Sequence, residues 1–209
     1  MLLYSGFVKR LLDIAASIVL IVLLAPVMLL TWLAVRLVLG APALFYDERA
    51  GLHGRPFQIA KFRSMTAATD SAGQLLPDAD RLGTFGKLLR RTSLDELPQL
   101  FSVLIGDMSL VGPRPLPMRY VERYDARQAT RLLARPGITG WAQIHGRNAV
   151  AWPDRLEYDA QYVERLGRWT APLTDCWIVL VTIVQISWQA LTGRGVSAPG
   201  EATMQEFTP

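Results

Sequence analysis

The chain has 209 residues, which fits one compact domain with an appended segment, and its mean hydropathy of +0.22 is high for a water-soluble protein. Its 22 Lys and Arg residues stand against 18 Asp and Glu residues, and this small excess suits contact with phosphates or anionic lipid but does not indicate a nucleic-acid-binding protein. The single cysteine excludes an intramolecular disulfide, and the two histidines lack the spacing of a zinc site.

The first predicted element is an apolar helix. Residues 14–35 contain no charged side chain, and a helix of about 22 residues is long enough to cross the hydrocarbon core of a bilayer. Lys9 and Arg10 precede this segment and predict a cytoplasmic N-terminus. Pro26 lies near its middle, where a proline kinks or breaks a helix. The residues alone are compatible with a spanning helix and with a re-entrant helix that returns to the face it entered.

The chain changes character after residue 40. Residues 43–46 and 56–63 predict two short strands around a turn, and residues 66–83 predict an exposed polar loop. The last predicted helix is strongly apolar and favours an interfacial helix against lipid, with a core helix or a second span as alternatives. Helices are predicted at 85–91, 95–105, 118–134, 154–166 and 175–191. The predicted organisation is a membrane segment at 1–40, a folded domain at 41–192 and an irregular tail at 193–209.

Asp95 and Glu96 form an acidic pair with two interpretations. Ser93 followed by Glu96 three residues later, before an apolar run, is typical of a helix capping box. The pair also follows Arg90 and Arg91, and adjacent carboxylates at a helix start beside arginines predict a site for a phosphate and a divalent ion. The local sequence leaves both interpretations open.

Cationic side chains recur in three further segments. A guanidinium group binds phosphate oxygens through two parallel hydrogen bonds, so each segment is a candidate phosphate contact, although each is also compatible with a solvated surface. The segments contain Lys61 and Arg63 on one side of a predicted strand, Arg114 between Pro113 and Pro115, and Arg147 in a glycine-punctuated loop.

Four fragments are informative together. In chain order they are Lys-Phe-Arg-Ser-Met (61–65), Leu-Asp-Glu-Leu-Pro-Gln-Leu (94–100), Gly-Asp-Met-Ser-Leu-Val-Gly-Pro-Arg-Pro (106–115) and Arg-Pro-Gly-Ile-Thr-Gly-Trp-Ala-Gln-Ile-His-Gly-Arg-Asn (135–148). Over nearly the whole chain, this series resembles the bacterial sugar transferase family, the monotopic phosphoglycosyl transferases that begin glycan assembly on polyprenyl phosphate. The resemblance implies transfer of a sugar-1-phosphate from a UDP-sugar to undecaprenyl phosphate, with release of UMP.

The resemblance also implies a role for each matched residue. Asp95 matches the nucleophile, which forms a covalent phosphosugar-aspartyl intermediate in a ping-pong reaction, and Glu96 matches a residue that assists with the metal or the acceptor. The implied cofactor is Mg²⁺, held by these two carboxylates and the diphosphate. The other matches are Lys61, Arg90, Arg114 and Arg147 as phosphate contacts, Pro113 and Pro115 beside the nucleotide, and Asp159 and Tyr162 in support of the site.

The fold implied by the resemblance is a mostly helical α/β fold. It has a re-entrant N-terminal helix hairpin in the membrane, a small cytosolic catalytic domain with short strands, and interfacial amphipathic helices. Pro26 is the expected break in the hairpin, although Ala25 stands where the family usually has serine. The implied location is the bacterial inner membrane, in contact with its lipid, with the catalytic domain on the cytoplasmic face. Downstream glycosyltransferases and a second copy of the chain are further candidate partners.

Two other functions are compatible with parts of the sequence. Asp78-Ala79-Asp80 has the Asp-x-Asp pattern of metal-dependent glycosyltransferases, which release UDP instead of UMP. A non-enzymatic membrane scaffold would use the basic residues and apolar helices equally well, but it leaves the acidic pair at 95–96 unexplained. The motifs do not indicate which sugar is transferred, because all UDP-sugar donors share the uridine and the phosphates.

Overall fold

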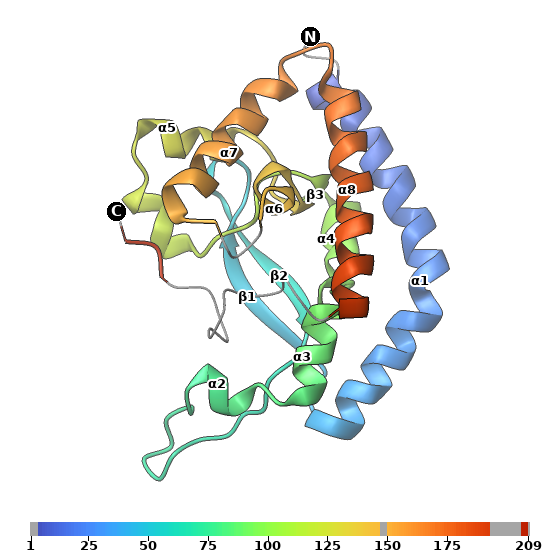
Figure 1. The fold of residues 1–209 in the computed structure, drawn as a ribbon, viewed down its shortest axis with the longest axis vertical. Helices are drawn as coiled ribbons and strands as arrows, with labels where there is room; N and C mark the ends of the chain where they lie inside the picture. The colour runs from blue at the N-terminus through green and yellow to red at the C-terminus, as the bar shows by residue number, and fades with distance from the viewer. Residues whose placement is uncertain (1–3, 147–149, 193–205, 209) are drawn as a thin grey trace.

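The computed structural model describes residues 4–146, 150–192 and 206–208 and is mostly helical (Figure 1). A long N-terminal helix runs beside a domain of shorter helices and two small sheets. This architecture confirms the predicted mostly helical fold with short strands and an apolar N-terminal helix. Arg147 and most of the predicted tail at 193–209 lie outside the described residues.

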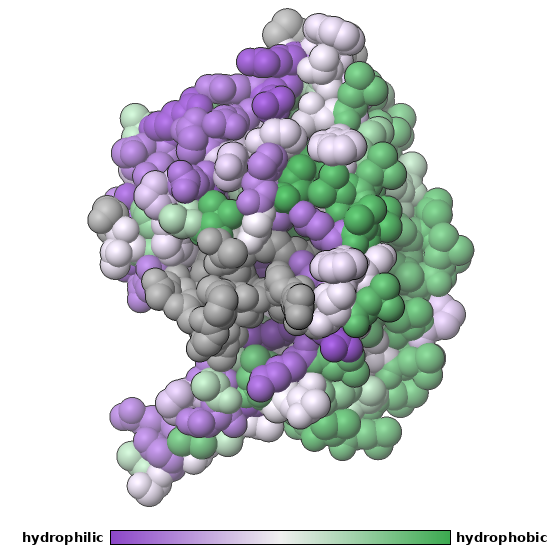
Figure 2. Space-filling model, in the orientation of Figure 1, coloured by the Kyte–Doolittle hydropathy of each residue, from purple (hydrophilic) through white to green (hydrophobic). Residues whose placement is uncertain are grey.

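The N-terminal helix α1 (Lys9–Leu39), entered through a short π-helical turn (Tyr4–Val8), is continuous through Pro26. Figure 1 shows a single bent helix where a helix hairpin was predicted, so the re-entrant topology stays a prediction. Both α1 and the last helix, α8 (Ala171–Thr192), are long and apolar enough to cross a membrane. Apolar side chains gather along the side of the molecule that these two helices form (Figure 2).

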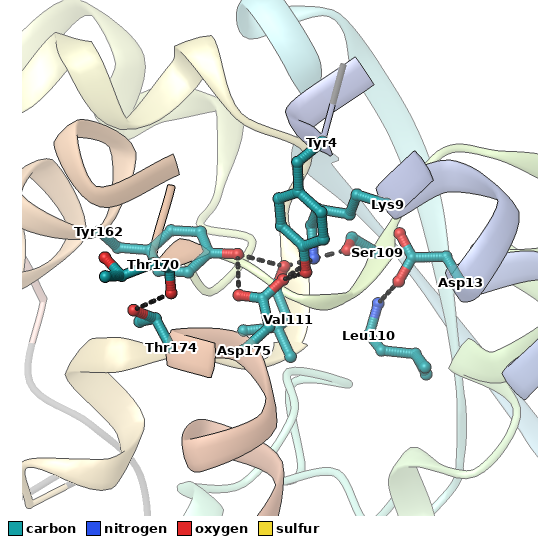
Figure 3. A network of polar contacts seen from close by, with 10 residues as sticks. All are labelled: Tyr4, Lys9, Asp13, Ser109, Leu110, Val111, Tyr162, Thr170, Thr174 and Asp175. Atoms are coloured by element: carbon teal, nitrogen blue, oxygen red, sulfur yellow. Dashed lines mark hydrogen bonds and ion pairs between the residues drawn. The ribbon is translucent and has the colours of Figure 1, made fainter. Parts of the chain in front are cut away.

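Polar contacts attach the start of α1 to the domain. Arg10 donates hydrogen bonds to the backbone carbonyls of Val103 and Leu104 at 2.5 and 2.7 Å. Asp13 accepts a hydrogen bond from the backbone N–H of Leu110 at 3.0 Å (Figure 3). These side chains therefore bind backbone groups that lie about a hundred residues later in the chain.

The end of α1 is attached to the same domain. Arg63 donates hydrogen bonds to the carbonyls of Leu39, Gly40 and Ala41, which follow or close the last turn of the helix. A cation at this end also complements the negative end of the helix dipole. Val35 is fully buried in an apolar cluster with Ala43, Phe62 and Leu89. Both ends of this apolar helix are thus held by one domain.

The first sheet is an antiparallel hairpin of β1 (Leu44–Ala50) and β2 (Pro56–Phe62), as the sequence predicted. Successive side chains of a strand point to opposite faces. In β2, Ile59 and Lys61 therefore share one face, and Ala60 lies on the other.

The second sheet pairs β3 (Ser109–Val111) with β4 (Gly137–Thr139) in parallel, a pairing that the sequence did not predict. The loop after β3 lies very close to the segment before β4. A Cβ atom on Gly112 would lie 2.2 Å from the carbonyl oxygen of Arg135, so this position requires glycine. This close packing places the Pro-Arg-Pro loop at 113–115 against the body of the domain.

The helix predicted at 118–134 is three short helices: η4 (Met118–Arg123), α5 (Ala126–Ala129) and η5 (Thr130–Leu133). Tyr124 is extended, and Asp125 starts a new helix through a capping box with Gln128. The single-helix prediction was wrong because it missed this internal cap. The remaining helices are η2 (Leu52–Gly54), α2 (Asp78–Arg81), α3 (Thr84–Arg91), η3 (Leu94–Glu96), α4 (Gln99–Ile105), α6 (Trp141–Ile144) and α7 (Trp152–Leu166).

Residues 206–208 return to the domain. Phe207 is 2% exposed and packs against the rings of Tyr120, Tyr124 and Trp152. Its backbone N–H donates a hydrogen bond to the Tyr120 hydroxyl at 3.1 Å. This part of the predicted tail is therefore anchored in an aromatic cluster.

Candidate functional site

The acidic pair lies in the 3₁₀ turn η3, between α3 and α4. Ser93, just before the turn, has a left-handed backbone with φ of 55°, and its side chain forms no cap hydrogen bond with the residues that the structure describes. The capping-box interpretation was therefore wrong, and α4 begins only at Gln99, after Pro98. The turn frees the side chains of Asp95 and Glu96 for contacts with other parts of the domain.

Glu96 joins three separate segments of the chain. Its Oε1 atom accepts a hydrogen bond from Lys61 Nζ of β2 at 2.8 Å and another from a terminal nitrogen of Arg114 at 2.7 Å. Burial opposes ionisation of this carboxyl group, but the positive charges of Arg114 and Lys61 outweigh burial and hold the pKa of Glu96 well below its usual range. Glu96 is therefore ionised and fixes the positions of two cations.

Asp95 has a different environment. Asp95 is 8% exposed, and its carboxylate accepts no hydrogen bond from any residue that the structure describes. Burial and the charge of Glu96 raise the pKa of Asp95 to about 6, against the opposing effects of Lys61, Arg90 and Arg114. Asp95 is thus a mostly ionised carboxylate at neutral pH, near three cations and available to react with a ligand.

Arg90 lies in the last turn of α3 and donates a hydrogen bond from Nε to Ser64 Oγ at 3.0 Å. Burial lowers the pKa of Arg90, and the nearby charge of Asp95 acts in the opposite direction. Its guanidinium is therefore a third cation near the buried carboxylate. Together, Lys61, Arg90 and Arg114 place three positive charges near the two carboxylates, an arrangement that can bind phosphate groups.

A small cavity of about 50 Å³ adjoins this cluster. It is lined by Lys61, Arg114 and Pro115, which the sequence singled out, and by Arg49, Ile59 and Gln99, which it did not. Pro113 does not line it, but its carbonyl accepts a hydrogen bond from the backbone N–H of Gly137 at 2.8 Å and so ties the loop to β4. The two prolines therefore shape and anchor the loop that carries Arg114.

Asp159, on α7, is connected to the loop that carries Arg114 through an arginine that the sequence analysis did not single out. Arg131 donates two hydrogen bonds to Asp159 Oδ2, at 3.0 and 2.9 Å, and both side chains are almost fully buried. A terminal nitrogen of Arg131 also donates to the backbone carbonyl of Arg114 at 2.6 Å. The ion pair therefore holds the backbone of a residue whose side chain binds Glu96.

Tyr162, also on α7, belongs to a second polar network (Figure 3). Its hydroxyl lies 3.0 Å from the carbonyl of Val111 and 2.9 Å from Asp175 Oδ1. Asp175 Oδ2 in turn accepts hydrogen bonds from Lys9 Nζ at 2.6 Å and from the Tyr4 hydroxyl at 2.8 Å. This network joins α1, α8 and α7 to β3, and Tyr162 contacts the backbone just before the loop that carries Arg114.

The structure sorts the predicted site residues into groups. Lys61, Asp95, Glu96 and Arg114 form one cluster with Arg90 nearby, whereas Arg63 lies at the end of α1 and Arg147 lies outside the described residues. Sequence reasoning missed Arg131, Lys9 and Asp175 as structural residues. The charged pair of Lys9 and Asp13, one helical turn apart before an uncharged run, was the available signal for a buried anchor.

Comparisons with known proteins add independent information. The family model described as bacterial sugar transferase matches residues 4–189. The chain is 46% identical to the uncharacterized sugar transferase EpsL of Bacillus subtilis, over 96% of this chain and 95% of that protein. It is 42% identical to the UDP-glucose:undecaprenyl-phosphate glucose-1-phosphate transferase of Caulobacter vibrioides, over 84% of this chain and 68% of that protein.

A third relative is longer. The chain is 41% identical to the UDP-N-acetylgalactosamine-undecaprenyl-phosphate N-acetylgalactosaminephosphotransferase of Aeromonas hydrophila, over 91% of this chain but only 45% of that protein. The chain thus spans nearly all of one relative and less than half of another. The shared region in each case includes the segments that form the cluster around Glu96.

Proposed function

The chain belongs to the bacterial sugar transferase family, and from this premise we propose that it transfers a sugar-1-phosphate from a UDP-sugar to undecaprenyl phosphate and releases UMP. The observation that carries the proposal is the buried carboxylate of Asp95, which stands near three cations without a hydrogen-bond donor among the described residues. The names of two relatives, which include undecaprenyl phosphate and a transferred sugar phosphate, support the choice of acceptor.

In the proposed mechanism, a carboxylate oxygen of Asp95 attacks the β-phosphorus of the UDP-sugar. A bond forms between this oxygen and the phosphorus, the bond to the bridging oxygen breaks, and UMP leaves with that oxygen. A phosphate oxygen of the polyprenyl phosphate then attacks the same phosphorus and releases Asp95, which yields a polyprenyl diphosphate sugar. Dividing the transfer into two displacements at one nucleophile predicts ping-pong kinetics.

The cations position the donor in this mechanism. Lys61 and Arg114 are held by Glu96, and Arg90 by Ser64, so their side chains are ordered before the diphosphate arrives. Ordered cations stabilise charge on the phosphate oxygens without first reorganising. Glu96, whose Oε1 already accepts from two cations, is proposed to orient them and to contribute a metal ligand.

The residues of the site fit a Mg²⁺ ion that arrives with the diphosphate. The described residues contain no group of three or more His, Cys, Asp or Glu side chains that could hold a metal ion. Mg²⁺ is commonly held by one or two carboxylates together with substrate phosphate oxygens, and the adjacent Asp95 and Glu96 provide such a pair. When bound, the ion would neutralise charge on the diphosphate. Adding EDTA is expected to abolish UMP release, and excess Mg²⁺ is expected to restore it.

The contacts of α1 support the proposed re-entrant topology. One domain binds the start of the helix through Arg10 and Asp13 and its end through Arg63, and these contacts support a topology in which both ends lie on the same side of the membrane as that domain. We place this side at the cytoplasmic face of the inner membrane, because Lys9 and Arg10 predict a cytoplasmic N-terminus.

The topology is tested by labelling single cysteines near the two ends of α1. Gly6→Cys and Phe45→Cys, each in a Cys176→Ser background, are expected to react with an impermeant maleimide in inverted membrane vesicles and not in intact cells. Both positions are exposed in the structure. Labelling of the two positions from opposite sides would show a spanning helix and contradict the proposal.

The reaction is tested by measuring products. Purified protein is incubated with Mg²⁺ and a panel of UDP-sugars, with and without undecaprenyl phosphate, and UMP and UDP are quantified. We expect UMP whose turnover needs the acceptor and which is lost in Asp95→Asn. Asp80→Asn, an exposed aspartate of the Asp-x-Asp pattern, is the matched control and should retain activity. UDP as the product, or loss in the control alone, would favour the glycosyltransferase alternative.

A further inference from the structure

An open apolar cleft of about 520 Å³ lies on the opposite face of the β1–β2 hairpin from the catalytic cluster. Its walls come from α1, from the hairpin and from α4, and include Met28, Trp32, Tyr46, Ala60, Pro98 and Phe101. None of its lining residues is charged. The proposed mechanism uses none of these side chains, so the cleft has no role in the phosphate chemistry described above.

The cleft exposes much of its apolar surface. Tyr46 is 59% exposed and Phe101 48% exposed, and Trp32 of α1 is 40% exposed. An apolar hollow of this kind indicates a contact with lipid, a ligand or a protein. Because one wall is the apolar helix α1, the cleft opens to the part of the molecule that we place in the membrane.

The cleft also reaches the catalytic turn. In β2, Lys61 binds Glu96, whereas its neighbours Ala60 and Phe62 line the cleft on the other face. At the start of α4, Pro98 lines the cleft, two residues after Glu96. The same short stretch of chain therefore borders the apolar cleft on one side and carries the reactive carboxylates on the other.

We propose that this cleft binds the isoprene units of the acceptor that lie next to its phosphate. The inference rests on the proposed function and adds the binding site of the lipid tail. A branched, unsaturated chain suits a wall of aromatic and methionine side chains. A tail held here is anchored beside the turn at 94–98, so its phosphate would be delivered from the membrane to Asp95.

Two substitutions test the proposal from opposite directions. Ala60→Trp places a large side chain in the cleft, and Trp32→Ala removes one of the α1 side chains that line it. Each is expected to raise the KM for undecaprenyl phosphate about tenfold or more, a typical effect of altered apolar contacts in a binding pocket. Trp188→Ala in α8 is the matched control, because Trp188 is an exposed tryptophan on an apolar helix and does not line the cleft. An unchanged acceptor KM in both cleft variants would overturn the proposal.

The first half-reaction separates this inference from the proposed function. A burst of UMP without acceptor is expected to be the same in both cleft variants and in the unmodified protein, which also shows that the variants are folded. If the unmodified protein gives no burst, the proposed function fails. A normal burst with an unchanged acceptor KM means that only the cleft assignment fails.

Photocrosslinking identifies the occupant. A photoreactive phenylalanine analogue at position 101 is expected to crosslink to undecaprenyl phosphate in nanodiscs, and excess unlabelled undecaprenyl phosphate should compete. Crosslinks only to phospholipid, or only to a second copy of the chain, would overturn the proposal. The side chain of Phe101 is suited to this experiment because it lines the cleft and is half-exposed.

Discussion

The cluster around Glu96 and the network around Asp175 both join a lysine to a carboxylate far away in the sequence. The Nζ atom of Lys61 lies 2.8 Å from Oε1 of Glu96, and the Nζ atom of Lys9 lies 2.6 Å from Oδ2 of Asp175. The two regions differ in whether their buried carboxylates have hydrogen-bond donors. Both oxygens of Asp175 have partners in the protein, whereas Asp95, beside Glu96, is buried without a donor among the described residues. A buried carboxylate with all its partners indicates a structural role, and the lack of a donor at Asp95 supports the reactive role proposed for it.

The two regions are connected through the segment that follows β3. Tyr162 of the Asp175 network contacts the carbonyl of Val111, and Arg131 contacts the carbonyl of Arg114, three residues later. The Asp175 network and the Arg131–Asp159 ion pair together hold the segment that carries Arg114, one of the cations of the cluster around Glu96. The comparison predicts that substitutions in the cluster around Glu96 mainly reduce catalysis, and that substitutions in the Asp175 network mainly reduce stability.

The largest expected effect is on catalysis, in Asp95→Asn. Removing the proposed nucleophile should lower kcat by at least about a thousandfold. The same change removes a buried charge that has no hydrogen-bond donor in the described protein, so thermal stability should be unchanged or higher. Parallel UMP assays and thermal melts in detergent measure both effects. A large loss of stability would contradict the reactive role, because it would show that Asp95 is held by structural contacts.

Asp175→Asn should have the opposite effects: a loss of stability with little change in catalysis. It leaves the buried ammonium of Lys9 without its counter-charge, which is expected to cost about 3 kcal/mol of unfolding free energy. The kcat per folded molecule, normalised by the UMP burst, should change little. The double variant Lys9→Met with Asp175→Asn should recover part of the lost stability, because no unpaired cation remains. Full activity loss with normal stability in Asp175→Asn would reverse the assignment of the two regions.

The sequence revealed the reactive region better than the structural one. The acidic pair and the cations at 61, 90 and 114 belong to short motifs with recognisable chemistry, and they proved to lie together. The partners of Asp175 come from positions 4, 9 and 162, and no local pattern connects such distant residues. The parallel pairing of β3 with β4 was missed for the same reason, since strands of three residues carry little periodicity.

A smaller effect is expected for Arg131→Lys. Lysine keeps a positive charge beside Asp159, but it cannot also reach the carbonyl of Arg114 with a planar group, so the loop should shift. Small displacements in an active site are costly, and kcat/KM for the UDP-sugar should fall about tenfold or more. Burst titration counts the active sites, so a purely structural role would reduce the burst amplitude and leave kcat/KM per site unchanged.

The smallest effect is expected for Arg63→Gln, which tests a residue that the sequence grouped with the phosphate contacts. Arg63 donates to the carbonyls of Leu39, Gly40 and Ala41, and these bonds fix the end of α1 to the domain. Losing hydrogen bonds from a charged donor should lower the unfolding free energy by about 1–2 kcal/mol, while the KM for the UDP-sugar stays within roughly twofold. Lys61→Gln is the matched control from the same fragment, and it should raise that KM because Lys61 belongs to the cluster around Glu96. If Arg63→Gln raised the KM as much as the control and left stability unchanged, Arg63 would be a phosphate contact. The donor site would then include the end of α1.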